Sequence, residues 1–289
     1  MPERITGTTR LGGLLGSPVA HSKSPLMHNE AFRLLGLDYV YLCFDMGPEN
    51  LARTVEALRD LHVYGFNLTM PLKTAVIPCL DALSKEAKLI GAVNTVKNED
   101  GTLIGYNTDG MGFMRSVREH GVTVLGSTIT ILGAGGAASA ISVQAAIDGA
   151  AAVHIVSRRG RSWEKAQDLA RRISENTACR ADLTDLGDIA ALSGLLQASD
   201  LLVNATSVGM APHTDESPLP APAILPPSLP VGDVIYHPAK TLLLSQAAER
   251  SCPTFNGMDM LLYQGEAAFR IWTGQNMPVE QIRALFFSE

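Results

Sequence analysis

The chain has little cysteine, and its cysteines are not arranged as a metal site or a redox pair. Among 289 residues there are four, at positions 43, 79, 179 and 252, so no CxxC spacing occurs. His21 and His28 are seven residues apart and have no further ligand-type residue at a metal-binding spacing. We therefore expect no metal site, reduced cysteines and a structural role for both histidines.

The chain also lacks an excess of basic residues and any long apolar run. Its 23 lysines and arginines are outnumbered by 29 aspartates and glutamates, which gives a net charge of −6. Proteins that bind nucleic acids usually carry a basic face, so a small-molecule partner is expected instead. No run reaches the roughly 18 apolar residues that span a bilayer, and no signal-peptide core follows the first residues. We expect no membrane partner and a cytoplasmic location.

Apolar residues are plentiful, at 46% of the chain, which suffices for one large or two modest domains. In the first part of the chain, apolar runs alternate with helical patterns. Strands are predicted at residues 11–16, 39–44 and 63–68, and helices at residues 25–35 and 48–60. Both helices open with proline, which suits the first helical turn. This β-α-β-α order is typical of an α/β fold.

A second alternation begins near residue 109. Its predicted elements are helices at 110–120 and 137–147 and strands at 128–132, 153–156, 199–206 and 231–236. Continuous apolar strands indicate parallel strands buried on both faces, so a Rossmann-type sheet is expected. Residues 212–230 contain seven prolines and are predicted to form a surface loop. Helices at 261–273 and 279–287 are expected to return to the first part.

A glycine turn, Gly133–Ala137, follows a predicted strand directly and opens a predicted helix. Glycines there permit a tight turn and let the backbone approach a pyrophosphate at the amino terminus of the helix. The alternative is a turn that needs glycine only for packing. The βαβ setting favours dinucleotide binding.

The second strand of this sheet ends in a basic stretch, Ser157–Arg161. NAD-selective folds usually carry an acid at this place, and none is present. Three guanidinium groups suit the 2′-phosphate of NADP, because arginine offers planar, charge-assisted donors. The alternative is a solvated basic loop. NADP is therefore favoured, and use of NAD stays open.

Lys73 and Asp109 are candidates for handling the proton that accompanies a hydride transfer. Which of the two is the base stays open. Taken singly, each residue has an ordinary structural explanation. Lys73 could be a surface lysine, and Asp109 an acid in the first turn of a helix. Polar residues that follow apolar runs accompany them: Asn67, Thr69, Asn94 and Thr108. Taken together, these residues favour a functional site.

The stretch Ser22–Pro25 predicts a helix start, with Ser24 as the cap and Pro25 as the first helical residue. Helix capping explains Ser24 but not Ser22. The hydroxyl of Ser22, together with the backbone donors of the helix start, would also suit a small carboxylate.

Seven motifs occur in order along the chain: His21–Pro25, Asn67–Lys73, Gly91–Thr95, Tyr106–Gly110, Gly133–Ala137, Asn204–Met210 and Tyr263–Gly265. Together they resemble the shikimate dehydrogenase family, including its quinate/shikimate dehydrogenase branch. The resemblance covers nearly the whole chain, and the combination is far more specific than any single motif.

The resemblance implies a two-domain α/β enzyme that reversibly reduces 3-dehydroshikimate to shikimate with a nicotinamide cofactor, its active site lying between the domains. The N-terminal α/β substrate-binding domain would comprise residues 1–108 plus 256–289, so the C-terminal helices return to it. A Rossmann-type NAD(P)-binding domain would comprise residues 109–255. A homodimer is left open.

The same resemblance assigns roles to individual residues. Lys73 and Asp109 take the catalytic positions. The substrate positions fall on Ser22, Ser24 and Tyr236 for the carboxylate, and on Thr69, Asn94 and Gln264 for the hydroxyls or the site wall. The cofactor positions fall on Gly133, Gly135, Gly136 and Ala137 for the glycine loop, on Ser157, Arg158 and Arg159 for the adenosine end, and on Asn204, Thr206, Ser207 and Gly257 for the nicotinamide end.

Two departures from the family pattern bear on the cofactor. Gly160 stands where the quinate/shikimate branch can carry an aspartate, so NADP is the expected cofactor and NAD an alternative. Asp259 stands where the family often has glycine, and a carboxylate beside the nicotinamide would weaken its binding.

The substrate also has an alternative. The serines at 22 and 24 and the segment 67–69 resemble the shikimate-selective members, whereas Tyr236–Leu243 resembles the broader branch. A broad-specificity quinate/shikimate dehydrogenase that uses NAD as well as NADP therefore stays open.

Overall fold

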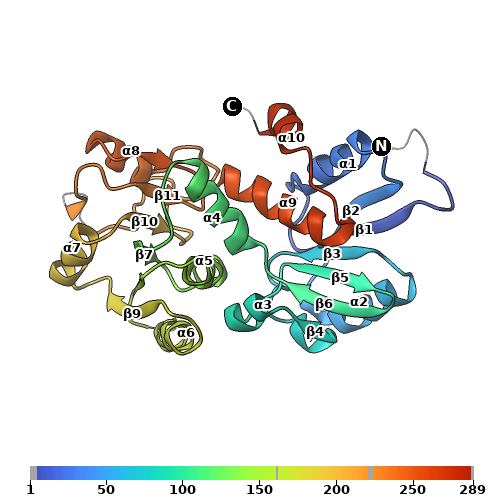
Figure 1. The fold of residues 1–289 in the computed structure, drawn as a ribbon, viewed down its shortest axis with the longest axis horizontal. Coiled ribbons are helices and arrows are strands. Elements are labelled where there is room, and N and C mark those ends of the chain that lie inside the picture. Colours follow the sequence, from blue (N-terminus) through green and yellow to red (C-terminus); the bar gives the residue numbers. More distant parts are fainter. Residues whose placement is uncertain (1–4, 161, 221–223, 288–289) are drawn as a thin grey trace. The chain divides into compact units, whose positions relative to one another are not determined.

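The computed structural model describes residues 5–160, 162–220 and 224–287. They fold as two compact units, each built around its own six-stranded sheet (Figure 1). The first unit consists of Met1–Thr108 and Leu262–Glu289, and the second of Asp109–Leu261. Within the described residues, no helix has the length and apolar character needed to cross a membrane.

The sheet of the first unit is mixed. Its strands are β1 (Arg10–Gly16), β2 (Tyr39–Asp45), β3 (Gly65–Leu68), β4 (Ala82–Leu83), β5 (Thr95–Glu99) and β6 (Thr102–Tyr106), in the spatial order β2-β1-β3-β5-β6-β4. The first three strands pair in parallel, as the β-α-β-α pattern predicts. β5 and β6 form an antiparallel hairpin that pairs with β3, an arrangement not predicted above.

Helices from both ends of the chain cover this sheet. They are α1 (Ser24–Leu34), α2 (Leu51–Asp60), α3 (Lys85–Ile90), α9 (Met258–Thr273), which enters the unit at Leu262, and α10 (Val279–Phe286); short 3-10 turns lie at Pro48–Asn50 and Ile77–Cys79. A cluster of buried apolar side chains under α2 includes Val55, Phe66 and Val96. The return of the C-terminal helices to this unit is confirmed.

An aromatic cluster joins α1 and α9 to the sheet. The ring of Phe32 lies 5.2 Å from that of Phe269, and the ring of Tyr64 lies 5.5 Å from that of Trp272. The indole of Trp272 donates a hydrogen bond to the carbonyl of Val96 at 2.9 Å. Aromatic burial and a satisfied indole together fix α9 on the sheet.

The second unit contains a parallel sheet with the order expected of a dinucleotide-binding fold. Its strands are β7 (Thr128–Leu132), β8 (Ala152–Ser157), β9 (Arg180–Asp185), β10 (Leu201–Asn204), β11 (Val231–Asp233) and β12 (Thr254–Phe255), in the order β12-β11-β10-β7-β8-β9. From β7 the strand order runs outwards to β8 and β9 on one side and to β10, β11 and β12 on the other. The order therefore reverses between β7 and β10, and ligands bind at such a switch point. The predicted Rossmann-type sheet is confirmed.

The connections of this unit are α4 (Asp109–Glu119), α5 (Gly136–Ile147), α6 (Trp163–Asn176), α7 (Ile189–Gln197) and α8 (Leu242–Glu249). The proline-rich segment contains neither α-helix nor strand in its described residues 212–220 and 224–230. It is nevertheless anchored, because Leu219, Leu225 and Leu229 are buried in an apolar cluster with α7 and α8.

Candidate functional site

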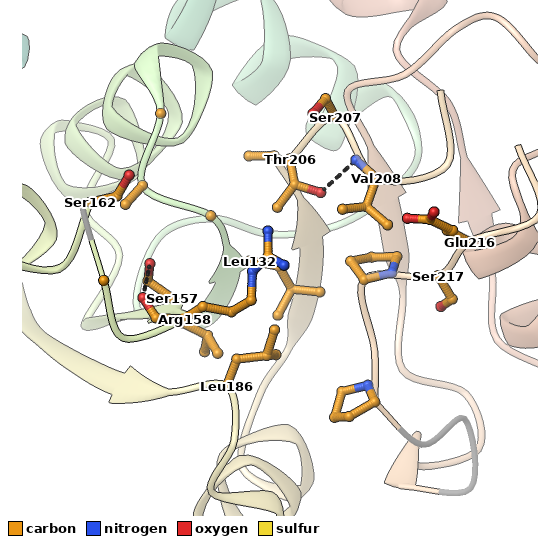
Figure 2. Close-up of a pocket in the computed structure, with 18 of the residues that line it drawn as sticks. Leu132, Ser157, Arg158, Ser162, Leu186, Thr206, Ser207, Val208, Glu216 and Ser217 are labelled. Atoms are coloured by element: carbon orange, nitrogen blue, oxygen red, sulfur yellow. Dashed lines mark hydrogen bonds between the residues drawn. The ribbon is translucent and has the colours of Figure 1, made fainter. Parts of the chain in front are cut away.

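A cavity of 790 Å³ opens at the carboxyl ends of β7, β8 and β10, within the second unit (Figure 2). The cavity is lined by the residues of three strand ends and by the proline-rich segment. Seven of the predicted cofactor residues line it: Gly133, Gly135, Ser157, Arg158, Arg159, Thr206 and Ser207. The structure thus brings the glycine loop, the basic stretch and the loop after β10 to one place.

The glycine loop is shaped for close approach of a ligand. Gly133 has a φ of +112°, and a Cβ there would lie 3.0 Å from both the Ala205 carbonyl oxygen and the methyl of Thr206. A side chain at Gly133 would therefore meet strain and crowding. Within the part of the chain that the structure describes, no atom lies within 4 Å of a Cβ built at Gly135 or Gly136, so the backbone faces open space.

α5 begins at Gly136, with Gly135 as the N-cap and no capping side chain. Its first backbone N–H groups and the helix dipole suit a pyrophosphate. Ala137 is half-buried in this first turn, and neither Gly136 nor Ala137 is among the cavity-lining residues. The loop and helix therefore fit the phosphates of a dinucleotide.

The two arginines after β8 differ in their partners. Arg159 donates from Nε to Oδ2 of Asp185 at 2.6 Å, and its guanidinium lies 4.7 Å from the centre of the Trp163 ring. Figure 2 shows the Arg158 guanidinium extending from the end of β8 towards Leu132 in the cavity. Among the described residues, the Arg158 guanidinium has no hydrogen-bond or ion-pair partner. Of the two arginines, Arg158 therefore has the guanidinium whose donors are not already used by an acid.

The far wall of the cavity was not predicted from the sequence. It comes from the proline-rich segment, through Glu216, Ser217, Pro218 and Pro220. Figure 2 shows the Glu216 side chain beside Val208. The leucines interspersed with these prolines were the available signal, because they indicate a segment packed on a core rather than a free loop.

Asn204 lies at the end of β10 and is fully buried. Its Oδ1 accepts from the backbone N–H of Thr206 at 3.0 Å and from the Thr206 hydroxyl at 2.7 Å. Its Nδ2 donates to Oδ1 of Asp233 at 3.1 Å. The Asn204 side chain thus shapes the loop that carries Thr206 and Ser207 into the cavity.

In the first unit, a buried polar network lies where β3 ends and β5 begins. The Tyr41 hydroxyl donates to Oδ1 of Asn67 at 2.7 Å, and Asn67 Nδ2 donates to the carbonyl of Asn94 at 3.0 Å and to the Thr95 hydroxyl at 2.9 Å. Asn94 Oδ1 in turn accepts from the backbone N–H of Thr108 at 2.8 Å. Burial raises the pKa of Tyr41 well above its usual value, so the Tyr41 hydroxyl keeps its proton to donate.

The two serines at the start of α1 differ from the predicted capping arrangement. Ser24 is the first residue of α1 and is buried, and Lys23 occupies the cap position without a side-chain cap bond. The prediction that Ser24 caps the helix is wrong, because the Ser22 hydroxyl accepts from the Ser24 backbone N–H at 3.2 Å instead. Ser22 takes the side-chain role expected of Ser24.

The other predicted substrate residues are half-buried. Thr69 follows β3, and its carbonyl accepts from the N–H of Leu72 at 2.8 Å, which turns the chain towards Lys73. Gln264 lies on α9 in the first unit. Tyr236 follows β11 in the second unit.

The candidate catalytic residue Lys73 is held by a hydrogen bond to its backbone, and Asp109 follows a residue that is held in the same way. The carbonyl of half-buried Lys73 accepts from the N–H of Val93 at 2.8 Å. Asp109 begins α4 and is 8% exposed, and it directly follows Thr108, whose N–H is held by Asn94. The adjacent residues Val93 and Asn94 therefore hold Lys73 and the residue before Asp109.

Gly257 precedes α9 and is buried. Its N–H donates to the carbonyl of Ile235 at 3.0 Å. A Cβ at this position would overlap the carbonyl group of Val234, so only glycine fits without a backbone shift. Gly257 thus holds the chain close to the segment that leads to Tyr236.

Comparisons with known proteins agree along the whole chain. The family model described as the Shikimate dehydrogenase substrate binding domain matches residues 14–96, and that described as the Shikimate 5′-dehydrogenase C-terminal domain matches residues 257–285. A protein of Listeria monocytogenes serotype 4b (strain F2365), named Shikimate dehydrogenase (NADP(+)), is 47% identical over 99% of this chain and 98% of its own length.

Solved structures give the same result. The shikimate 5-dehydrogenase of Listeria monocytogenes, in complex with shikimate and NAD, is 47% identical over 99% of each chain, with a TM-score of 0.96. The quinate dehydrogenase of Corynebacterium glutamicum, in complex with NAD, is 31% identical over 97% of this chain and 99% of its own, with a TM-score of 0.86. With its Rossmann-type cofactor cavity and full-length similarity to these enzymes, the chain belongs to the shikimate dehydrogenase family.

Proposed function

We propose that this enzyme catalyses the reversible reduction of 3-dehydroshikimate to shikimate with NADPH, and that Lys73 and Asp109 handle the proton. One observation carries the assignment of the two residues. Val93 binds the carbonyl of Lys73, and the adjacent Asn94 binds the N–H of Thr108, the residue before Asp109. Two consecutive residues thereby hold the backbone of Lys73 and that of Thr108, in a chain whose relatives carry the name shikimate dehydrogenase.

The nicotinamide, when bound, supplies the hydride in reduction and accepts it in oxidation. The hydride is transferred to or from one carbon of the substrate. The protein must also move one proton to or from the oxygen on that carbon. In oxidation, the hydroxyl O–H breaks as the C=O double bond forms, and the proton passes to Lys73 or Asp109. In reduction, the same group returns the proton to the carbonyl oxygen. The partner of opposite charge holds the proton-transfer group in place.

In this proposal, six side chains contact the substrate. Ser22, Ser24 and Tyr236 bind its carboxylate through their hydroxyls. Thr69, Asn94 and Gln264 contact the ring hydroxyls or form the wall of the site. The network around Asn67 supports this assignment, because its fully hydrogen-bonded side chains fix the backbone on which Thr69 and Asn94 lie.

The cofactor residues fit a dinucleotide phosphate chain. Gly133, Gly135, Gly136 and Ala137 form the glycine loop and helix start that receive the pyrophosphate, and the open space over Gly135 and Gly136 is what close approach requires. Ser157, Arg158 and Arg159 form the adenosine end. Asn204, Thr206, Ser207 and Gly257 form or support the nicotinamide end.

NADP is the cofactor favoured by the basic stretch and by the name of the relative at 47% identity. A solved relative of the same identity binds NAD, so both cofactors belong in the test. The shikimate reaction is favoured over the quinate reaction, because the quinate dehydrogenase is only 31% identical.

The test is a set of initial rates, followed by the absorbance of reduced nicotinamide, for shikimate and quinate each combined with NADP and NAD. We expect the highest kcat/KM for shikimate with NADP. Comparable values for quinate or NAD would instead assign the enzyme to the broad-specificity branch. No turnover of either acid would refute the proposed reaction.

The same assay tests the catalytic pair. Lys73→Met and Asp109→Asn should each lower kcat about 100-fold or more, the loss expected when a positioned proton-transfer group is removed. NADP binding, measured by calorimetry, should survive both changes. Lys85→Met, which removes an exposed lysine of the same unit, is the control. Near-normal turnover in both variants would exclude the proposed roles.

A homodimer and a cytoplasmic location remain proposals from the sequence. The acidic balance of the chain, with a net charge of −6, supports an enzyme that acts on small molecules. Sedimentation velocity would decide the oligomeric state, and cell fractionation the location.

A further inference from the structure

A second carboxylate in the cofactor-binding unit has no role in the reaction described above. Asp233 ends β11 and is 0% exposed, on the strand that lies between β12 and β10 in the second unit's sheet. A buried carboxylate is costly unless donors surround it. Burial raises the pKa of Asp233, while the hydrogen bonds from Ile235, Asn204 and Thr241 oppose that rise.

The three donors come from three different segments. Asn204 Nδ2 donates to Oδ1 of Asp233 at 3.1 Å, and the backbone N–H of Ile235 donates to the same oxygen at 2.9 Å. The hydroxyl of Thr241 donates to Oδ2 at 2.8 Å. Asp233 therefore fixes the end of β10, the segment after β11 and the start of α8 with respect to one another.

One branch of this network leads to the cofactor cavity. Asn204, held by Asp233, accepts from both the N–H and the hydroxyl of Thr206, and the Thr206 hydroxyl accepts from the N–H of Val208 at 3.1 Å (Figure 2). Thr206 and Val208 line the cavity. A shift at Asp233 would be passed through side-chain hydrogen bonds to the cavity wall.

A second branch leads to Tyr236. The N–H of Ile235, the residue before it, is bound by Asp233, and the N–H of Val234 donates to the carbonyl of Asn204 at 3.0 Å. Asp233 therefore acts on the backbone that presents the Tyr236 hydroxyl and on the loop that presents Thr206.

The third branch ends on a helix cap. Thr241 is the N-cap of α8, and its hydroxyl accepts from the N–H of Leu244 at 3.3 Å while it donates to Asp233. Thr241 is not among the residues that line the cavity. The cap thus offers a place to disturb Asp233 without touching either ligand.

We propose that Asp233 is a positioning residue that sets the nicotinamide-end loop and Tyr236 in one common geometry. Buried ionic groups add little net stability, and their well-attested use is to select one arrangement among several. With donors from three segments, the carboxylate is satisfied only when all three are in place. The part of this inference that concerns Tyr236 rests on the proposed function, whereas the part that concerns the cavity wall does not.

The experiment compares Thr241→Val, Thr241→Ser and Ser245→Ala with the unaltered enzyme. Valine keeps the shape of threonine but leaves Oδ2 of Asp233 without its donor. Serine keeps the hydroxyl. Ser245 lies on α8 and donates to the carbonyl of Thr241 at 3.0 Å, so Ser245→Ala removes a neighbouring hydrogen bond of the same helix start and leaves the Asp233 bond in place.

We expect Thr241→Val to raise the Kd of NADP⁺, measured by calorimetry without substrate, by roughly tenfold, the equivalent of one buried hydrogen bond. The KM for shikimate should rise with it, while kcat falls less. Thr241→Ser should restore both constants. Ser245→Ala should leave both constants unchanged.

Folded Thr241→Val with both constants within twofold of the unaltered enzyme would overturn the inference. Should that variant fail to fold, Asp233→Asn provides the same comparison, since it removes the charge and keeps the volume. An enzyme that binds NADP⁺ but turns over no shikimate would refute the proposed function alone, because the effect on NADP⁺ binding would still be measurable.

Discussion

Arg159 donates from Nε to Oδ2 of Asp185 at 2.6 Å, whereas the guanidinium of the neighbouring Arg158 extends into the cofactor cavity. The pairing of β8 with β9 brings Ser157 opposite Asp185, and so places this acid next to the basic stretch. The Gly187 N–H and Arg159 both hold the pKa of Asp185 below its usual value, so the acid stays ionised at neutral pH. The two neighbouring arginines therefore have different electrostatic surroundings.

Arg158→Ala should lower kcat/KM for NADP by about 10- to 100-fold, since hydrogen bonds to charged groups contribute roughly 1.5–3 kcal/mol. The value for NAD should change little, because NAD lacks the 2′-phosphate. Arg159→Ala is the matched comparison and should have a smaller effect, because Asp185 already partly neutralises Arg159. Equal losses with both cofactors would show that Arg158 does not discriminate between them.

His28 gives the first unit a dependence on pH. It is fully buried, and among the described residues neither ring nitrogen has a hydrogen-bond partner. Its ring lies 4.6 Å from that of Tyr41 and 5.2 Å from that of Trp272. Burial lowers the pKa of His28 from 6.5 to about 3, because the charged form cannot be solvated.

The unfolded chain therefore binds a proton at His28 between pH 6.5 and 3, whereas the folded unit does not. Stability is complete above pH 6.5 and falls as the pH drops through this window, by up to about 1.4 kcal/mol per pH unit. Urea unfolding at pH 7.5 and 5.5, followed by Trp272 fluorescence in a Trp163→Phe background, should show a smaller pH effect for His28→Phe. His62→Asn, at an exposed histidine of the same unit, is the control. An unchanged pH effect in His28→Phe would contradict the assignment.

Lys23 separates Ser22 and Ser24, the two serines proposed to bind the substrate carboxylate, and its Nζ donates to the carbonyl of Phe286 at 3.1 Å. It also lies 5.3 Å from the centre of the Phe287 ring. Because Phe286 ends α10, the ammonium lies at the negative end of a helix dipole. Lys23 thus ties the serines to the C-terminal helix.

Lys23→Met should raise the KM for shikimate by about three- to tenfold, less than the loss of a direct ligand contact, because the Lys23 hydrogen bond holds the stretch that carries the two serines and goes to Phe286. The KM for NADP and kcat should stay close to their original values. Lys23→Arg keeps a donor and a charge, and should fall between the two. A change confined to the KM for NADP would contradict this role.

The Rossmann-type sheet was predictable because buried parallel strands give continuous apolar runs, and because Gly133 and Gly135 mark the switch point. The hairpin of β5 and β6 was not predicted, although Asp100–Gly101 between two short strands is a usual hairpin signal. Its polar residues interrupt the apolar pattern on which the prediction relied.

The sequence predicted the residues on one side of the cofactor cavity, but not those on the opposite wall. Local motifs identify residues next to one another in the sequence, such as Arg158 and Arg159. Glu216 reaches the cavity from a segment without regular secondary structure, and Asp233 acts through partners 29 and 8 residues away in the chain. Such contacts depend on tertiary packing, which a single sequence does not show.

Gly135 and Gly257 are both predicted cofactor residues, yet the structure constrains them differently. Among the described residues, a Cβ at Gly135 would meet no atom within 4 Å, whereas one at Gly257 would overlap the carbonyl group of Val234. Gly135→Ala should therefore leave the thermal midpoint unchanged and raise the Kd of NADP⁺ by roughly tenfold or more, because the methyl occupies the space into which the pyrophosphate fits.

Gly257→Ala should instead destabilise the second unit by about 1–3 kcal/mol, the usual cost of an added carbon in a packed site. Gly194→Ala on α7, with open space around its Cβ, is the control and should leave NADP⁺ binding unchanged. Thermal melts and calorimetry on the three variants separate the two effects. If Gly135→Ala bound NADP⁺ normally, the phosphate chain could not lie against this turn, and the glycine would be there for the geometry of the strand-to-helix connection alone.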